Sequence, residues 1–200
     1  MNLLSWNCRG LGTPRIVRDL CQLVRENKPK LVLLMETKMS NKKIAFLKIK
    51  TGFENIFAVD SMGRSGGLAL LWRDDILVEI QNYSRRHINA IISQDNNGPK
   101  WKFTGFYRHP NTTKHTEAWF LLRHLSHLQP NPWLCMGDFN EIVSLFEKRG
   151  VAARARGQML AFQNALEDYE LSDLGFRGPN SRGIMGIMEI SMFKNGLTRQ

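Results

Sequence analysis

Three short polar clusters each follow an apolar run of the chain, and they carry side chains that can bind a hard metal ion and activate water. The clusters are Ser5-Trp6-Asn7, Met35-Glu36-Thr37 and Gly137-Asp138-Phe139-Asn140-Glu141. Residues at strand ends and in adjoining loops are held in place by the rigid sheet behind them. A carboxylate that closes a buried strand is poorly hydrated and requires a cation or a hydrogen-bond donor nearby. Together, the clusters predict one site built from strand ends.

The carboxylates and amides of these clusters are suited to different tasks. Glu36 offers the hard oxygen ligand that Mg²⁺ prefers. Asp138 can act as a general base on water, and Asn140 would place an amide on the same side of an extended backbone. Each residue alone has a simpler explanation. Asp138 and Asn140 both favour turns, Glu36 could start a helix or stay solvated, and Asn7 could lie in a turn.

Basic and aromatic side chains near these clusters are candidate contacts to phosphate. Tyr107 ends a further predicted strand, and a phenol and a guanidinium can both hydrogen-bond a phosphate. The candidate nucleic-acid contacts are Arg9, Arg85, Arg86 and Arg108. Tyr107 could instead be an ordinary aromatic strand residue that precedes a turn at Pro110. Arg85 and Arg86 could instead be the exposed start of a strand.

Two other patterns have a chemical and a structural interpretation. His124 and His127 lie three apart on a predicted helix, but no third zinc ligand is in view, so a solvated helix face is favoured. Backbone amides of Arg64-Ser65-Gly66-Gly67 could cradle a phosphate, but a hairpin turn is the more usual use of such a sequence.

Elements that could position these residues follow from the apolar spacing. A strand is predicted over residues 2–7, a helix from Thr13-Pro14 to Pro29, a buried strand over Leu31–Met35, and a helix from Ser40 to Lys50. The middle of the chain is rich in β-branched and aromatic residues. Its predicted strands are Phe53–Val59, Gly67–Trp72, Ile76–Tyr83, His87–Ser93 and Lys100–Tyr107.

The last predicted elements are a helix over residues 116–128, a strand over Trp133–Gly137 and an amphipathic helix over Gln158–Tyr169. Closely spaced strands in the middle should pair as antiparallel hairpins. Helices flank this block in sequence, so an α/β fold of two packed sheets flanked by helices fits best. A single Rossmann-type sheet would need helices between the middle strands.

Composition narrows the class of protein. The 200 residues suffice for one ordinary domain, and the formal net charge of +10 favours a polyanionic partner, with nucleic acid before acidic membrane. Three widely spaced cysteines suggest neither a disulfide framework nor a metal site. Neither a signal peptide nor a membrane span is visible, so an intracellular location, nucleus or cytoplasm, is expected. We expect no membrane partner, and nothing in the sequence indicates an oligomer.

Five motifs occur in an order that resembles the DNase I-like endonuclease/exonuclease/phosphatase superfamily. They are Ser5-Trp6-Asn7-Cys8-Arg9-Gly10, Met35-Glu36-Thr37-Lys38, Gly66-Gly67-Leu68-Ala69, Gly105-Phe106-Tyr107 and Gly137-Asp138-Phe139-Asn140. The chain most resembles the apurinic-type endonuclease domain at the front of LINE-type (non-LTR) retrotransposon polyproteins. The resemblance runs from residue 1 to about residue 180. Each motif is weak alone, and the ordered set is strong.

The resemblance implies a four-layer α/β sandwich that hydrolyses DNA with Mg²⁺, or with Mn²⁺ as the alternative. Glu36 would hold the metal, and Asn7 would orient the ligands around it. Asp138 would polarise the attacking water. Asn140 would help to position the phosphate, and Tyr107 would hydrogen-bond it.

Two motifs of the family pattern are missing. One is an Arg-Leu-Asp strand, and the other is a Ser-Asp-His near the end of the domain. No Asp-His pair occurs in the sequence. We therefore expect a fold that is incomplete at the C-terminus. For this chain we therefore favour an inactive retroelement remnant that binds nucleic acid without cleaving it, or has no function, while the domain type remains that of an endonuclease. An alternative is a phosphatase or phosphodiesterase acting on lipid or inositol phosphates.

Residues 181–200 depart abruptly from the family, and we expect them to be translated out of frame. Permitted codons for this stretch, read after the insertion of one base, give a stop-free frame that contains Arg-Leu-Asp. The expected division is therefore a partial domain over residues 1–180 and a tail over 181–200. Such a tail was not selected to pack on this core, so it should be poorly ordered and supply no site residue. A flexible tail is the alternative.

Overall fold

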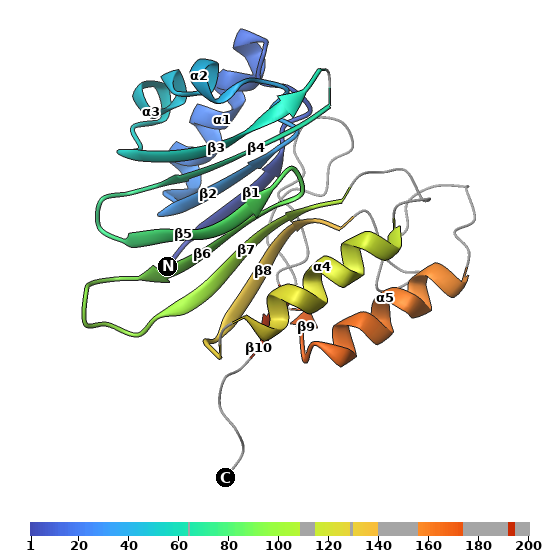
Figure 1. Cartoon of the computed structure of the whole chain (residues 1–200). Helices are drawn as coiled ribbons and strands as arrows, with labels where there is room; N and C mark the ends of the chain where they lie inside the picture. Colours follow the sequence, from blue (N-terminus) through green and yellow to red (C-terminus); the bar gives the residue numbers. More distant parts are fainter. Residues whose placement is uncertain (64, 109–114, 129, 140–155, 174–191, 195–200) are drawn as a thin grey trace.

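Two β-sheets pack face to face, and helices cover the outer face of each (Figure 1). The computed structural model describes residues 1–63, 65–108, 115–128, 130–139, 156–173 and 192–194. The predicted α/β sandwich of four layers is confirmed.

The first sheet has four strands in the order β1-β2-β4-β3. Their bounds are β1 (Leu3–Asn7), β2 (Leu31–Met35), β4 (Ser65–Trp72) and β3 (Asn55–Met62). Strands β1 and β2 are parallel, because α1 (Pro14–Asn27) returns the chain between them, and the other pairs are antiparallel. Every residue of β2 is buried, as its unbroken apolar run predicts.

The second sheet has the order β5-β6-β7-β8-β10-β9. Its strands are β5 (Leu77–Ser84), β6 (His87–Ser93), β7 (Trp101–Tyr107), β8 (Trp133–Asp138), β10 (Met192–Lys194) and β9 (Ser172–Asp173). Strands β7 and β8 are its parallel pair, joined through α4 (His115–His127). The predicted hairpins β3–β4, β5–β6 and β6–β7 form, whereas β4 and β5 belong to different sheets.

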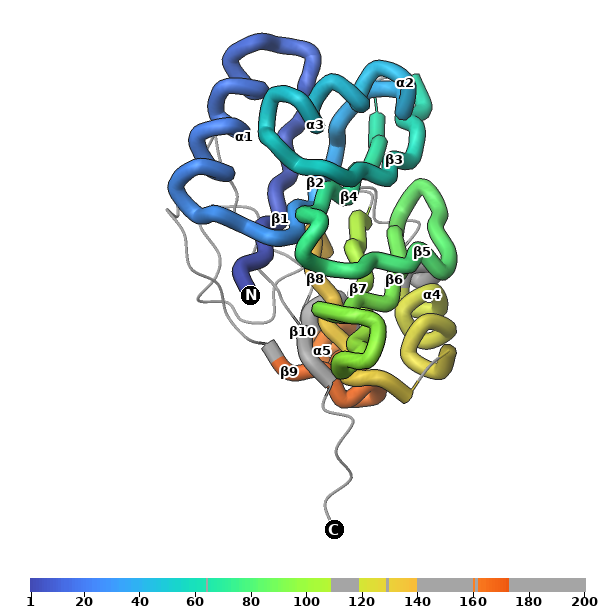
Figure 2. The backbone as a smooth tube through the Cα atoms, turned by 90° about the vertical axis from the view of Figure 1, so that its left-hand side faces the viewer, coloured from blue at the N-terminus to red at the C-terminus, as the bar shows by residue number. Residues whose placement is uncertain are grey.

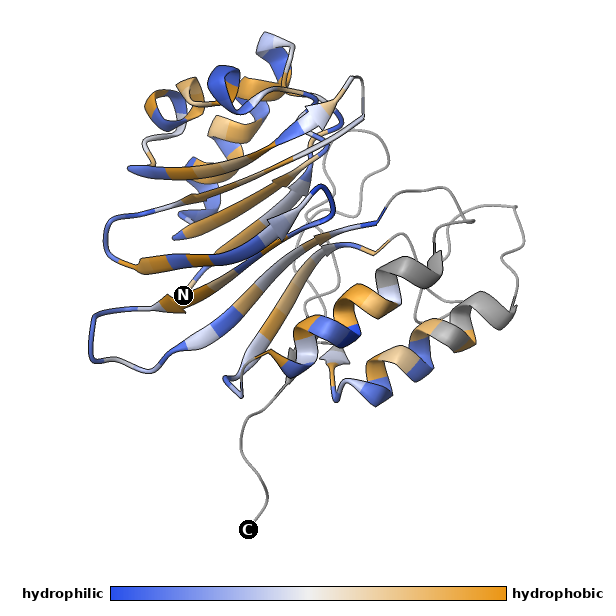
Figure 3. Cartoon of the chain, in the orientation of Figure 1, coloured by the Kyte–Doolittle hydropathy of each residue, from blue (hydrophilic) through white to orange (hydrophobic). Residues whose placement is uncertain are grey.

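Three apolar cores separate the four layers. One lies between the first sheet and the helices α1, α2 (Asn41–Ile44) and α3 (Phe46–Thr51). Figure 2 shows these three helices together at the top of the molecule, over the first sheet. The second fills the space between the sheets. The third lies between the second sheet and the helices α4 and α5 (Arg156–Asp168). Figure 3 shows hydrophobic residues along the strands of both sheets, as burial on one or both faces requires.

Local signals set most helix ends. Thr13 is extended and Pro14 opens α1, although the Thr13 side chain makes no capping hydrogen bond. The helix ends at Lys28, which is left-handed and donates its N–H to the Val24 carbonyl. The single helix predicted from Ser40 to Lys50 is wrong in detail: α2 and α3 are separate. The Lys48 N–H bonds the Ala45 carbonyl three residues back, which tightens the chain at the junction.

Three residues of the predicted tail take part in the second sheet. Met192–Lys194 form β10, which pairs antiparallel with β8 and with β9. Residues 181–191 and 195–200 lie outside the described residues. The expectation that the tail does not pack therefore has an exception at β10. Main-chain pairing depends little on sequence, and the edge of β8 offers its hydrogen-bonding groups to any extended segment. The reading-frame hypothesis itself stays a prediction.

Two glycines let backbones approach closely near the predicted site. A side chain at Gly105 on β7 would collide with Leu33 on β2, so this glycine sets the close approach of the sheets. Gly137 on β8 has φ +147°, and an added Cβ would overlap the Phe106 carbonyl oxygen of β7. Gly137 is therefore required both by its backbone conformation and by its neighbour.

Replacing Gly137 with alanine should lower the free energy of unfolding by about 3 kcal/mol or more, because β7 and β8 would have to separate. Urea unfolding followed by fluorescence measures this. The control is Gly12→Ala, since an added Cβ at Gly12 meets no atom within 4 Å in the described part of the chain. An equal loss in both variants would contradict the steric argument.

Candidate active site

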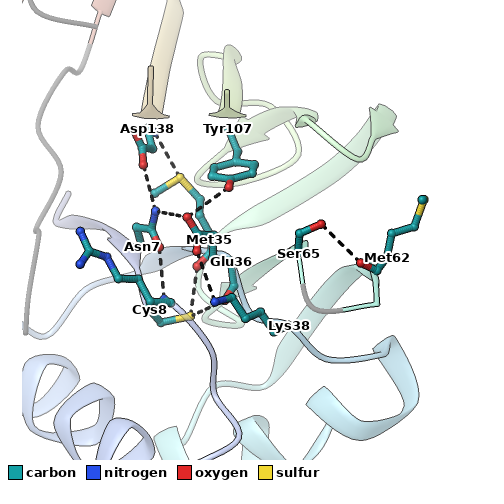
Figure 4. A network of polar contacts seen from close by, with 10 residues as sticks. Asn7, Cys8, Met35, Glu36, Lys38, Met62, Ser65, Tyr107 and Asp138 are labelled. Carbon is teal, nitrogen blue, oxygen red and sulfur yellow. Dashed lines mark hydrogen bonds and ion pairs between the residues drawn. The ribbon is translucent and has the colours of Figure 1, made fainter. Parts of the chain in front are cut away.

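The carboxyl ends of the two parallel strand pairs meet at one edge of the sandwich (Figure 4). Asn7 ends β1 and Glu36 follows β2 in the first sheet. Tyr107 ends β7 and Asp138 ends β8 in the second. Strand ends of parallel pairs lie side by side, so each sheet contributes two neighbouring side chains. Four of the predicted site residues are thereby brought together.

The side-chain amide of Asn7 connects the two carboxylates. Its Nδ2 donates to Glu36 Oε1 at 2.9 Å and to Asp138 Oδ2 at 2.9 Å. An ionised carboxylate only accepts hydrogen bonds, so the amide nitrogen must face both residues. The Asn7 Oδ1 atom points the other way and accepts the backbone N–H of Arg9 at 3.2 Å. Asn7 therefore fixes Glu36 and Asp138 relative to each other.

Tyr107 donates its hydroxyl to the same Glu36 Oε1 atom at 3.1 Å. The residue is 5% exposed. Burial raises the pKa of the Tyr107 phenol above its ordinary value, and the negative charges of Glu36 and Asp138 raise it further. The phenol is therefore a neutral hydrogen-bond donor at any ordinary pH.

A strained loop presents Glu36 to the site. Glu36 and Lys38 both have φ +52°, a conformation that costs non-glycine residues energy. The loop is held by the glycine pair of β4, because the Thr37 N–H donates to the Gly67 carbonyl and the Lys38 N–H to the Gly66 carbonyl. A side chain at Gly67 would collide with Thr37. The glycine pair therefore supports Glu36 through its carbonyls, whereas a phosphate cradle would use amides.

The oxygen donors at this edge fit a hard divalent metal ion. The Glu36 side chain is 20% exposed, and its Oε2 lies 3.8 Å from Lys38 Nζ, while Oε1 takes the hydrogen bonds from Asn7 and Tyr107. A part-exposed carboxylate oxygen is a ligand that Mg²⁺ accepts together with water. No group of three or more His, Cys, Asp or Glu side chains suited to a metal occurs among the described residues. The exposed His124 and His127 accordingly match the solvated face that was favoured for them.

The basic side chains near the site differ in their exposure to solvent. Arg9 is exposed directly after β1, and Arg85 is exposed in the β5–β6 turn. This turn lies at the same edge, because the Arg86 carbonyl accepts the N–H of Tyr107 at 2.7 Å. His87 anchors the turn through Ser84 and Asn82, and burial lowers the His87 pKa to about 4, so the ring is neutral at physiological pH.

Arg108 corrects a prediction. It is only 1% exposed, its Nη1 donates to the Phe139 carbonyl, and its guanidinium lies 4.8 Å from the centre of the Trp119 ring. These contacts place the charge in the core of the second sheet, where a cation can be held by carbonyls and aromatic faces. A direct contact from Arg108 to nucleic acid is therefore contradicted. Asn140 lies outside the described residues, and its predicted role stays a prediction.

Sequence reasoning missed two contributors. Lys38 forms the ion pair with Glu36, and its position two residues after Glu36 was a usable signal. Met35 accepts a hydrogen bond from the Asp138 backbone, but its place at the end of a buried apolar run indicates only core packing. Cys8 is not a nucleophile: burial raises its pKa to about 12, and its thiol donates to the Met35 carbonyl.

A family model described as "Endonuclease/Exonuclease/phosphatase family" matches residues 4–184. A sequence comparison with curated proteins gives no match. None of the described helices has the length and apolar content needed to cross a membrane.

Several solved structures share the fold. An AP endonuclease from Archaeoglobus fulgidus has a TM-score of 0.66 at 16% identity, over 96% of this chain and 86% of that one. The AP endonuclease LMAP from Leishmania major has a TM-score of 0.70 at 11% identity, over 98% and 79%. A variant of the 3′ phosphatase NExo from Neisseria, bound to a product DNA hairpin, has a TM-score of 0.63 at 16% identity, over 96% and 86%.

The raised pKa of Tyr107 predicts how the site responds to alkali. Phenolate absorbance is measured against pH in metal-free buffer for the folded wild type and for Tyr107→Phe. The difference between the two curves should show no step near pH 10, where free tyrosine ionises. The same difference measured on the chain unfolded in urea should show that step. The neutral Tyr107 phenol contributes fully to the free energy of unfolding below pH about 10, the pKa of tyrosine in the unfolded chain. This contribution is lost as the pH rises through the higher pKa of Tyr107 in the folded chain. A folded-state step near pH 10 would contradict the burial of the phenol beside the charges of Glu36 and Asp138.

Proposed function

Since the chain belongs to the endonuclease/exonuclease/phosphatase family, we propose that it hydrolyses phosphodiester bonds of DNA with a divalent metal ion, Mg²⁺ or Mn²⁺. The observation that carries the proposal is the bridge from the Asn7 amide to Glu36 and Asp138. Two carboxylates from different sheets, held by one amide, can serve one metal ion and one water molecule together. We further propose that the chain belongs with the apurinic-type nucleases of LINE-type retrotransposons.

Each described site residue has a task that follows from its contacts. Asp138 accepts the proton of the attacking water, and its hydrogen bond from Asn7 fixes the direction of the carboxylate. Tyr107 keeps its proton, and its single O–H can turn from Glu36 to donate a hydrogen bond to a phosphate oxygen. Glu36 would hold the metal through its Oε2 atom, since Oε1 takes the hydrogen bonds from Asn7 and Tyr107, and Asn7 would orient the ligands around it. A bound Mg²⁺ neutralises charge that develops on the phosphate and the leaving oxygen.

The surroundings of the site favour a long polyanionic substrate. Arg9 and the β5–β6 turn with Arg85 flank the site edge, and they would contact phosphates on either side of the cleaved bond. The solved structures with this fold include a TDP2 complexed with single-strand DNA product and NExo bound to a DNA hairpin. A lipid or inositol phosphate has no chain of phosphates on either side of the cleaved bond, so it would make little use of these flanking basic residues.

A second candidate is binding to nucleic acid without cleavage. The sequence has no Asp-His pair, although the family pattern uses one to contact the phosphate and to partner a catalytic group. A nuclease of this family that lacked such a pair would lose nearly all of its rate, because members of a cooperating set act together. In that case the basic residues near the site edge would still bind DNA, and binding would weaken steeply with salt.

Nicking of supercoiled DNA tests the proposal. Glu36→Gln and Asp138→Asn should each reduce the nicking rate by about a hundredfold or more, because each removes one carboxylate charge and keeps its shape. Matched controls are Glu26→Gln and Asp19→Asn, the same changes on the outer helix α1, and they should keep the wild-type rate.

Three other outcomes would point elsewhere. Nicking that is unchanged in Glu36→Gln and Asp138→Asn would show that the site lies in another part of the chain. Salt-sensitive DNA binding by a wild type that does not nick would support the second candidate. Release of phosphate from lipid or inositol phosphates, without nicking, would identify the competing substrate class.

A further inference from the structure

We propose that the Met35 thioether is a positioning residue for Asp138, through a hydrogen bond that it accepts from the Asp138 backbone N–H. The inference rests on the proposed function, because it assigns Met35 a part in the same site. The Asp138 nitrogen lies 3.2 Å from Met35 Sδ. Figure 4 shows this contact running from the end of β2 to the end of β8.

Met35 reaches Asp138 because its side chain points between the sheets. It is the last residue of β2, it is 0% exposed, and it belongs to the apolar core that the two sheets share. The close approach of the sheets at Gly105 and Leu33 brings β2 within reach of the second sheet. The Cys8 thiol donates to the Met35 carbonyl at 3.1 Å, which holds the Met35 backbone as well.

The Asp138 peptide needs this acceptor. Its carbonyl is bonded within the second sheet, to the N–H of Arg108 at 2.8 Å. Its N–H follows Gly137, whose φ of +147° rotates the strand end, and it meets the sulfur of the opposite sheet. A part-buried N–H that loses its acceptor costs about 1–3 kcal/mol, so the peptide would turn to find another partner.

Asp138 is therefore held at two points by the first sheet. The sulfur of Met35 on β2 fixes its backbone, and the amide of Asn7 on β1 fixes its carboxylate at 2.9 Å. With both hydrogen bonds in place, rotation about the Asp138 backbone is restricted, and the carboxylate keeps its position beside Glu36. Loss of the backbone hydrogen bond would remove one of these two points and leave the hydrogen bond from Asn7 in place.

Methionine in a core is ordinarily a flexible filler, so the experiment must separate the acceptor from the packing. Met35→Leu keeps almost the same volume and removes the sulfur. Met35→Gln keeps an acceptor of similar reach. The matched control is Met136→Leu, because Met136 is buried in the same core on β8, and in the described part of the chain its sulfur accepts no hydrogen bond.

Two measurements are made on the full chain: steady-state nicking of DNA, and hydrogen exchange of the Asp138 amide by NMR. In Met35→Leu we expect kcat to fall about tenfold with KM within about twofold, and Asp138 exchange to speed up about tenfold. Met35→Gln should recover most of kcat. Met136→Leu should keep kcat and Asp138 exchange within about twofold of wild type.

Unchanged kcat and unchanged Asp138 exchange in Met35→Leu would overturn the inference. Equal losses in Met35→Leu and Met136→Leu would also overturn it, since packing would then explain both. If the wild type does not nick DNA, the proposed function fails, while hydrogen exchange still decides this inference. Faster Asp138 exchange confined to Met35→Leu supports the positioning role, and unchanged exchange refutes it.

Discussion

The amide of Asn7 is the contact on which the site depends, because it joins two carboxylates that come from different sheets. Glu36 and Asp138 carry like charges, and two such charges close together repel each other strongly in a part-buried environment. A donor shared by both offsets that repulsion and sets their separation. The same pair of negative charges would attract the proposed divalent cation, and a bound cation would further offset the repulsion between the carboxylates.

Both sheets must be built in the same way for this contact to form. Each contains one parallel pair of strands, and the carboxyl ends of both pairs open at the same edge. Small residues then allow the close approach: Gly105 faces Leu33 across the sandwich, and Gly137 lies against the Phe106 carbonyl. The glycine pair of β4 holds the strained Glu36 loop from the side. The geometry at this edge therefore depends on positions where a side chain is excluded.

Positive charge in this protein has two uses, and net charge alone does not separate them. Arg9 and Arg85 are exposed at the site edge, where they can meet a polyanion. Arg108 and Lys102 are buried, each against a tryptophan ring and a backbone carbonyl: Trp119 and Phe139 for Arg108, Trp133 and Leu125 for Lys102. These buried cations connect the second sheet to α4, because Lys102 on β7 contacts Leu125 of α4 and Arg108, directly after β7, contacts Trp119 of α4. Part of the excess positive charge that indicates nucleic-acid binding therefore lies in the interior, where it cannot contact a polyanion.

The sequence by itself determined the strands, most helix ends, the two-sheet class and the grouping of Asn7, Glu36, Tyr107 and Asp138. These follow from local causes: apolar periodicity, Pro14 and Gly52 at helix ends, and polar residues placed directly after buried strands. Tertiary structure alone decided that Arg108 turns inward, that Met35 accepts a hydrogen bond, and that β10 joins β8. Each of these depends on atoms from distant segments, which no local pattern encodes. Asn7 and Asp138 are 131 residues apart, and only the packing of one sheet on the other brings them into contact.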